Sequence, residues 1–296
     1  MSDNVNHRLQ DAQRSLLGLT VGDAFGDRFF NRAAEILIDE RAIPRGPWPI
    51  TDDSIMALSI VDTLAAHGRI DQDHLAKLFG ARYWLDRERG YGGTAHGILS
   101  RIYEGEPWDV VSMQAFGGVG SMGNGGAMRA APIGAYFHDD YERVAAEAGR
   151  SAEVTHAHID GQAGAIAVAL AAAWAARGGN DPADLFKVVL RYTPDSHTRE
   201  CVGKAASLRL HFDVRTAVSA LGNGTQVVSH DTVPFSLWCV ARHLHAYEEA
   251  IWTTVSGLGD RDTTCAIVGG ILAANPDVKI PAEWIELREP LECMAL

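Results

Sequence analysis

Apolar residues recur along most of the chain at the three- and four-residue spacing of one helix face, and sustained alternation of apolar and polar positions is almost absent. This pattern predicts a mainly α-helical fold. Several segments begin with a helix-capping side chain, among them Asp73, Asp181 before Pro182, and Asp213. The predicted helices are 6–25, 53–67, 73–86, 94–104, 124–135, 141–154, 160–177, 182–191, 196–212, 213–220, 233–244, 247–256 and 262–274.

Glycine-rich segments at 90–93, 117–126 and 257–259 each lead directly into one of these predicted helices. The sequence shows no Pro/Ser-rich linker, no low-complexity tail and no internal repeat. We therefore expect one domain over residues 1–296, an all-α fold built as a compact, orthogonal multi-helix bundle.

The 296 residues include 38 acidic and 26 basic side chains, which gives a formal net charge of −12. No basic run is present, so a nucleic-acid backbone or an anionic membrane surface is not expected as the main partner. The longest apolar stretch, 163–176, is shorter than the roughly 20 residues that cross a bilayer. The sequence leaves the oligomeric state open.

The four cysteines form no C-x-x-C pair and lie in apolar or helical surroundings, which favours reduced, buried thiols. They are Cys201, Cys239, Cys265 and Cys293. The first 14 residues contain no apolar segment typical of a signal peptide. Together these features predict a cytoplasmic location.

Three consecutive oxygen-bearing side chains, Thr51, Asp52 and Asp53, stand at the start of an apolar helical run. One interpretation is a helix cap followed by acidic residues in the first turn, where the helix dipole favours negative charge. Because neighbouring side chains at a helix start diverge, one can also cap while the others point to a shared site. Both interpretations stay open.

A second cluster, Asp260-Arg261-Asp262-Thr263, opens the last predicted helix. It too could be a cap, with Arg261 pairing one carboxylate. If the two helix starts converge, up to four carboxylates meet, and divalent cations are needed to relieve their repulsion. Oxygen ligands suit hard cations such as Mg²⁺ or Mn²⁺ better than zinc. A two-metal site is the physical expectation.

A glycine-rich segment containing Ser121, Gly123, Asn124 and Gly125 precedes the predicted helix 124–135. Free backbone N–H groups at such a helix start can bind a phosphate, although a purely structural loop is an equal alternative. The segment lacks the Lys-Ser/Thr of a P-loop, and no G-x-G-x-x-G follows a strand. A Walker-type nucleotide site and dinucleotide redox chemistry are therefore disfavoured.

Five motifs in order along the chain resemble the ADP-ribosylglycohydrolase family, and they extend over nearly the whole sequence. They are Gly18 to Gly26, Thr51 to Ser54, Gly123 to Arg129, Thr155-His156, and Gly259 to Thr263. The resemblance implies the all-α fold of that family, with a binuclear Mg²⁺ or Mn²⁺ centre. It also implies cleavage of the glycosidic bond between ADP-ribose and a modified protein side chain, with arginine preferred.

The resemblance also assigns residues to the site. The implied metal ligands are Thr51, Asp52, Asp53, Asp260, Asp262 and Thr263. The residues implied to bind ADP-ribose are Gly92, Gly93, Ser121, Gly123, Asn124, Gly125 and His156. A carboxylate can orient or deprotonate the attacking water. This catalytic role falls to Asp53 or Asp262, which the sequence does not separate. Hydrolysis of a small ADP-ribose conjugate and non-catalytic ADP-ribose binding are the alternatives.

The chain departs from the family pattern at two positions. Phe30 stands where many members have a glutamate, so Glu35 could substitute, Phe29 and Phe30 could cover the ligand, or both rings could be core residues. Arg261 stands where a small threonine is common, and could pair with phosphate, pair with a carboxylate or point to solvent. The His156/His158 spacing fits a metal pair, but capping or packing at the rim is the more usual role.

Overall fold

The computed structural model describes residues 2–31 and 34–291, and every regular element in these ranges is a helix. Cys293 lies outside them, whereas Cys201, Cys239 and Cys265 are buried and free. The α-helices are α1 (Ser2–Asp27), α2 (Ala34–Asp39), α3 (Asp52–His67), α4 (Gln72–Leu85), α5 (Gly93–Tyr103), α6 (Trp108–Gly118), α7 (Ala131–Tyr136), α8 (Tyr141–Glu153), α9 (Ile159–Ala176), α10 (Pro182–Tyr192), α11 (His197–Ser207), α12 (Val214–Leu221), α13 (Ser229–Arg242), α14 (Tyr247–Val255), α15 (Arg261–Ala274) and α16 (Ala282–Leu287), with a 3₁₀ turn, η1 (Asn124–Gly126).

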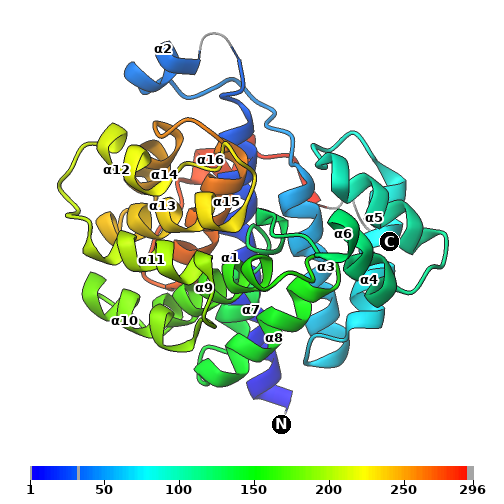
Figure 1. The fold of residues 1–296 in the computed structure, drawn as a ribbon. Helices are drawn as coiled ribbons and strands as arrows, with labels where there is room; N and C mark the ends of the chain where they lie inside the picture. The colour runs from blue at the N-terminus through cyan, green and yellow to red at the C-terminus, as the bar shows by residue number, and fades with distance from the viewer. Residues whose placement is uncertain (1, 32–33, 292–296) are drawn as a thin grey trace.

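The long helix α1 runs through the middle of the molecule, with α3 to α6 on one side and α9 to α14 on the other (Figure 1). Helix α15 packs along α1, and α13 and α9 pack against α15 in turn. Helices α7 and α8 lie below, against α9, and α2 projects from the opposite end (Figure 1). The all-α multi-helix fold predicted from the periodicity is confirmed.

A row of glycines lets α1 and α15 approach one another closely. A Cβ atom on Gly18 would lie 2.4 Å from the carbonyl oxygen of Gly269, and one on Gly22 would lie 2.2 Å from that of Cys265. Such distances are far below van der Waals contact, so only glycine fits at these positions. The contact fixes the N-terminal end of α15, where Asp260 and Asp262 stand, against the part of α1 that carries Asp23.

Helix α9 forms part of the core. Its 18 residues include Asp160 and Gln162 but are on average apolar, and the helix is long enough to cross a membrane; 83% of these residues are buried inside the protein. Ala and Gly dominate its sequence, so α7, α8 and α13 can pack closely around it. Its apolar character is therefore explained by packing within the protein.

The structure corrects several predicted helix bounds. The helix predicted over 124–135 is wrong: η1 ends after three residues, and a separate helix begins at Ala131 with Pro132 in its first turn. Helix α13 begins at Ser229 rather than 233, so Pro234 stands inside the helix and not in its first turn. Helix α11 ends at Ser207 rather than 212. The pattern missed α2 and α16, of six residues each, and α6, whose backbone is non-helical from Ala115 to Gly117.

Candidate metal and ligand site

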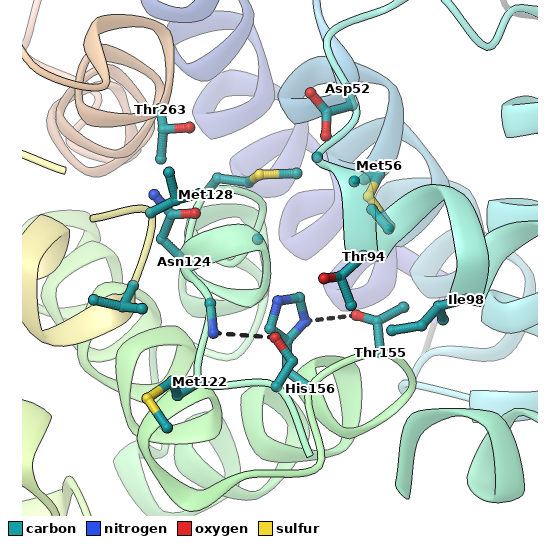
Figure 2. A pocket seen from close by; sticks show the side chains of 18 of the residues that line it. Asp52, Met56, Thr94, Ile98, Met122, Asn124, Met128, Thr155, His156 and Thr263 are labelled. Carbon is teal, nitrogen blue, oxygen red and sulfur yellow. Dashed lines mark hydrogen bonds between the residues drawn. The ribbon is translucent and has the colours of Figure 1, made fainter. Parts of the chain in front are cut away.

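A cavity of about 770 Å³ opens where the N-terminal ends of α3 and α15 converge. All the predicted site residues line it except Thr51. They are Asp52, Asp53, Gly92, Gly93, Ser121, Gly123, Asn124, Gly125, His156, Asp260, Asp262 and Thr263. Figure 2 shows Asp52 and Thr263 at one end of this cavity and His156 with Thr155 toward the other. The two acidic motifs, more than 200 residues apart in sequence, therefore meet in one site.

The acidic end of the cavity brings carboxylates from three helices together. One oxygen each of Asp23, Asp53 and Asp262 lie within 4.8 Å of one another. The Oδ1 atom of Asp53 accepts a long hydrogen bond of 3.5 Å from Thr263, and its Oδ2 atom is buried with no hydrogen-bond partner. A buried carboxylate oxygen without a partner is costly, so a cation at this point would stabilise the arrangement.

Asp23 belongs to this cluster although the sequence analysis assigned it no role. It is fully buried on α1 and accepts hydrogen bonds from the start of α3: from the Thr51 N–H at 3.0 Å, the Thr51 hydroxyl at 2.7 Å, and both the N–H and the hydroxyl of Ser54. The Thr51 hydroxyl also caps α3 by accepting from Asp53 N–H. Thr51 is thus engaged with Asp23, and its role as a metal ligand stays a prediction.

Burial and mutual repulsion raise the pKa values of these carboxyls. Burial raises the pKa of Asp23 to about 6, against the lowering effect of the Ser54 and Thr51 hydrogen bonds. Burial and then the Asp23 charge raise the pKa of Asp52 to about 8. Burial and neighbouring carboxylates, Asp262 and Asp260 respectively, raise the pKa values of Asp53 and Asp262 well above the ordinary value. Without a counter-charge, some of these groups must hold protons at neutral pH.

The donor set fits a hard divalent cation. All the candidate ligand atoms are carboxylate or hydroxyl oxygens, and one of them, Asp53 Oδ2, has no partner. Asp53 and Asp262 also stand in the first turns of α3 and α15, where the helix dipoles are positive but too weak to balance this many charges. The residues present can therefore hold Mg²⁺ or Mn²⁺, and the choice between the two and their number stay predictions.

One fully buried arginine lies behind the acidic end. Arg129 donates from Nη2 to the Thr155 hydroxyl at 2.9 Å and to the Ser151 carbonyl at 3.1 Å, and its guanidinium lies over the Phe79 ring. Burial lowers its pKa to about 9, and the charges of Asp52 and Asp53 act in the opposite direction. It is a fixed positive charge near the cluster.

The glycine-rich segment is tied to the acidic end by Asn124. Its side-chain amide donates to Asp260 Oδ2 at 2.7 Å and to the Thr232 hydroxyl at 3.0 Å. The expectation of free backbone N–H groups at a helix start is only partly met here, since no long helix follows. The N–H of Gly123 donates to the Ser121 hydroxyl, and that of Asn124 donates to the Val227 carbonyl.

The two departures from the family pattern contact each other outside the cavity. Arg261 Nη1 donates to the Phe29 carbonyl at 2.7 Å, and the guanidinium lies 5.0 Å from the Phe30 ring centre. Phe29 is a core residue, Phe30 is 51% exposed, and Glu35 is exposed on α2. None of the four lines the cavity. Arg261 therefore contacts the segment that follows α1, and it forms no ion pair with a carboxylate among the described residues.

The two histidines separate into different roles. His158 caps α9 by accepting from Asp160 N–H at 3.1 Å, as the capping alternative proposed. His156 lines the cavity, and its Nδ1 lies 2.7 Å from the Thr155 hydroxyl. They do not form a metal pair in the described residues, where the acidic triad is the group found with metal-ligand spacing.

The mouth of the cavity is apolar, a feature that was not predicted from the sequence. Phe116, Val119 and Val227 line it and are more than half exposed. Phe116 and Val227 also have positive φ angles, 52° and 55°, which side chains other than glycine rarely adopt. The only signal in the sequence was apolar residues among glycines and polar residues, which does not distinguish a binding surface from a turn.

Comparisons with known proteins show the family and the fold of this chain. The family model for ADP-ribosylglycohydrolase matches residues 4–295. The human protein ADP-ribosylhydrolase ARH3 is 28% identical over 280 residues, covering 82% of this chain and 75% of its own length. The protein of the same name from Xenopus tropicalis is 28% identical, covering 91% and 88%.

A solved structure described as an ADP-ribosylglycohydrolase-related protein complex superimposes with a TM-score of 0.71 at 23% identity, covering 98% of this chain and 95% of that one. This likeness confirms the fold. Since the family model extends over nearly every residue, the chain belongs to the ADP-ribosylglycohydrolase family.

Proposed function

We propose that this protein is a divalent-metal-dependent hydrolase that releases ADP-ribose from a modified protein side chain and so reverses mono-ADP-ribosylation. One observation carries the proposal: carboxylates from α1, α3 and α15 crowd one end of a large cavity, and Asp53 Oδ2 among them is buried without a partner. Family membership supplies the ADP-ribosyl chemistry.

Asp53 and Asp262 are the groups that we place at the reacting bond. A divalent cation bound by these carboxylates would supply charge to polarise a water molecule and the ribose hydroxyls. Asp53 is buried with one free oxygen, and Asp262 is half-buried at the cavity wall. Either can accept the proton of the attacking water and orient it toward the anomeric carbon.

The rest of the cavity suits the other parts of ADP-ribose. The segment from Ser121 to Gly125 and the imidazole of His156 form a polar middle section. The exposed ring of Phe116, with Val119 and Val227, offers an apolar surface on which a flat base can pack. A volume of about 770 Å³ lies in the range of small-molecule sites.

Arginine is the acceptor that we propose first. The resemblance of the five sequence motifs to the family carries this choice. Arg261 does not oppose this, because its guanidinium is directed to Phe29 and Phe30. We place the enzyme in the cytoplasm, where modified proteins are its substrates.

The test is release of ADP-ribose from ADP-ribosyl-arginine and ADP-ribosyl-serine peptides, measured with Mg²⁺, with Mn²⁺ and with EDTA. We expect turnover with a divalent cation, faster on the arginine peptide, and none in EDTA. Asp53→Asn and Asp262→Asn should each abolish turnover. Asp195→Asn is the matched control, since that side chain is 99% exposed and lies on a different part of the protein.

The outcomes separate the alternatives. Turnover of free ADP-ribose conjugates but of neither peptide would assign the site to a small-molecule hydrolase. Tight ADP-ribose binding without any turnover would assign it to a binding protein of the same fold. Activity that survives both aspartate substitutions would refute the catalytic assignment.

A further inference from the structure

A chain of three polar side chains, Arg129, Thr155 and His156, runs along the wall of the cavity. Arg129 Nη2 donates to the Thr155 hydroxyl oxygen at 2.9 Å, and this oxygen lies 2.7 Å from His156 Nδ1. Arg129 and Thr155 are buried, His156 is half-buried, and all three border the cavity. Figure 2 shows Thr155 beside His156. Arg129 and Thr155 themselves have no role in the proposed chemistry.

The direction of these hydrogen bonds follows from their donors. A guanidinium has only donors, so the Thr155 oxygen must accept from Arg129. The Thr155 hydrogen then needs an acceptor, and His156 Nδ1 is the one that the described residues place within reach. Nδ1 must therefore be unprotonated, and the proton of the neutral ring lies on Nε2.

The imidazole remains neutral in this position. Burial, and then the positive charge of Arg129, lower the pKa of His156 to about 3. The ring is therefore not an imidazolium at neutral pH, and the tautomer alone decides which of its nitrogens donates.

The Nε2 edge of His156 faces the glycine-rich segment. A Cβ atom built on Gly123 or on Gly125 would lie 3.2 Å from Nε2. The absence of side chains at these two positions leaves this edge of the ring open to the cavity, which His156 and both glycines line. Among the described residues, Nε2 has no hydrogen-bond partner of its own.

We propose that Thr155, itself oriented by Arg129, is a positioning residue: it holds His156 as the Nε2–H tautomer, which donates a hydrogen bond to a ligand oxygen over the glycine-rich segment. An unprotonated nitrogen at this edge would repel the same oxygen, so the tautomer decides whether the contact between Nε2 and the ligand oxygen is attractive or repulsive. That the oxygen belongs to a phosphate rests on the proposed function, whereas the tautomer does not.

The experiment compares Thr155→Val with the wild-type chain. Valine has the shape of threonine but neither donates to Nδ1 nor accepts from Arg129. The tautomer of His156 is read from two-bond ¹H–¹⁵N correlations of the imidazole in ¹⁵N-labelled full-length protein with Mg²⁺, with the signal assigned by its loss in His156→Gln. ADP-ribose affinity of the same proteins is measured by calorimetry.

We expect the wild-type ring to show a protonated Nε2 and an unprotonated Nδ1. In Thr155→Val, a substantial Nδ1–H population should appear and ADP-ribose affinity should fall by about tenfold, the value of one oriented hydrogen bond. Thr155→Ser keeps the hydroxyl and should restore both. Thr63→Val is the control, since Thr63 is equally buried but donates only to the Ser59 carbonyl in its own helix.

A wild-type ring protonated on Nδ1, or a tautomer unchanged in Thr155→Val, would overturn the proposal. So would a changed tautomer with unchanged ADP-ribose affinity, or an equal loss of affinity in Thr63→Val. A wild-type chain that does not bind ADP-ribose would refute the proposed function instead, and the correlation spectra would still decide the tautomer.

Discussion

Replacing Asp53 with asparagine should stabilise the protein when divalent cations are absent. Asp53 is 1% exposed, its Oδ2 atom has no partner, and its pKa is raised well above the ordinary value by burial and by Asp262. The folded chain therefore keeps a proton that the unfolded chain releases. Stability contributed by this proton is present at low pH and is lost as pH rises. Asparagine has the same shape without the charge.

The size of the effect follows from the geometry. Two carboxylate charges 4.8 Å apart repel by about 3 kcal/mol at an effective dielectric constant of about 20, and Asp53 has two such neighbours, Asp23 and Asp262. Because Asp53 can take up a proton instead of remaining charged, this repulsion destabilises the folded chain by at most about 1.4 kcal/mol for each pH unit above the unfolded pKa of 3.8. The variant should gain almost nothing at pH 4, and the gain should grow with pH toward about 3 kcal/mol, the repulsion from one such neighbour.

The assay is urea unfolding in EDTA, followed by circular dichroism at pH 4, 5, 6 and 7, with Asp195→Asn as the exposed control. The difference between Asp53→Asn and wild type should grow steadily over this range. If the variant is no more stable than wild type at pH 7, the carboxylates do not crowd one another as the structure shows, and the argument for a cation site loses its basis.

Three further outcomes test other parts of the structure. Saturating Mg²⁺, at a hundred times its dissociation constant, should raise the unfolding free energy of the wild-type chain by about 2.7 kcal/mol, and EDTA should remove the gain; no response in a thermal melt would contradict a cation site. Gly22→Ala should lower the unfolding free energy by about 3 kcal/mol or prevent folding, since its Cβ would lie 2.2 Å from the Cys265 carbonyl oxygen. Gly203→Ala has open space around its Cβ and should be neutral or slightly stabilising in the same melt. Arg261→Thr should lose the bond to the Phe29 carbonyl and speed hydrogen exchange at the end of α1, and unchanged exchange there would show that this contact is unimportant.

Much of the fold followed from local signals in the sequence. Helical periodicity and capping residues such as Asp181 and Asp213 act within a few residues, and both cap the helices that were predicted after them. One predicted cap was wrong, since Asp71 and not Asp73 caps α4 by accepting from His74 N–H. The larger errors came where tertiary contacts decide. Asn124 donates its side-chain hydrogen bond to the distant residue Asp260, and the helix predicted from 124 stops after the three residues of η1.

Some residues of the candidate site could be predicted from the sequence and others could not. The acidic residues Asp52, Asp53, Asp260 and Asp262 were recognisable because they stand together at helix starts. Asp23 was not, because its partners lie 28 and 31 residues further along the chain. Its position inside the motif Gly18 to Gly26, near the end of the first helix, was an available signal. The direction of the Arg261 side chain depends on packing that no local pattern encodes.

The glycines of α1 that contact α15 also determine the distance between two carboxylates of the site. Asp23 and Asp262 are carried by two helices whose backbones touch at Gly18 and Gly22, so the gap between these carboxylates is fixed by main-chain contact rather than by flexible side chains. Oxygen ligands bind Mg²⁺ at 2.0–2.1 Å and Ca²⁺ at 2.3–2.6 Å, so a few tenths of an ångström separate one ion from the other. A cation bound by these carboxylates would therefore be selected by radius through the packing of α1 against α15, and a change in that packing would alter the selection without replacing a ligand.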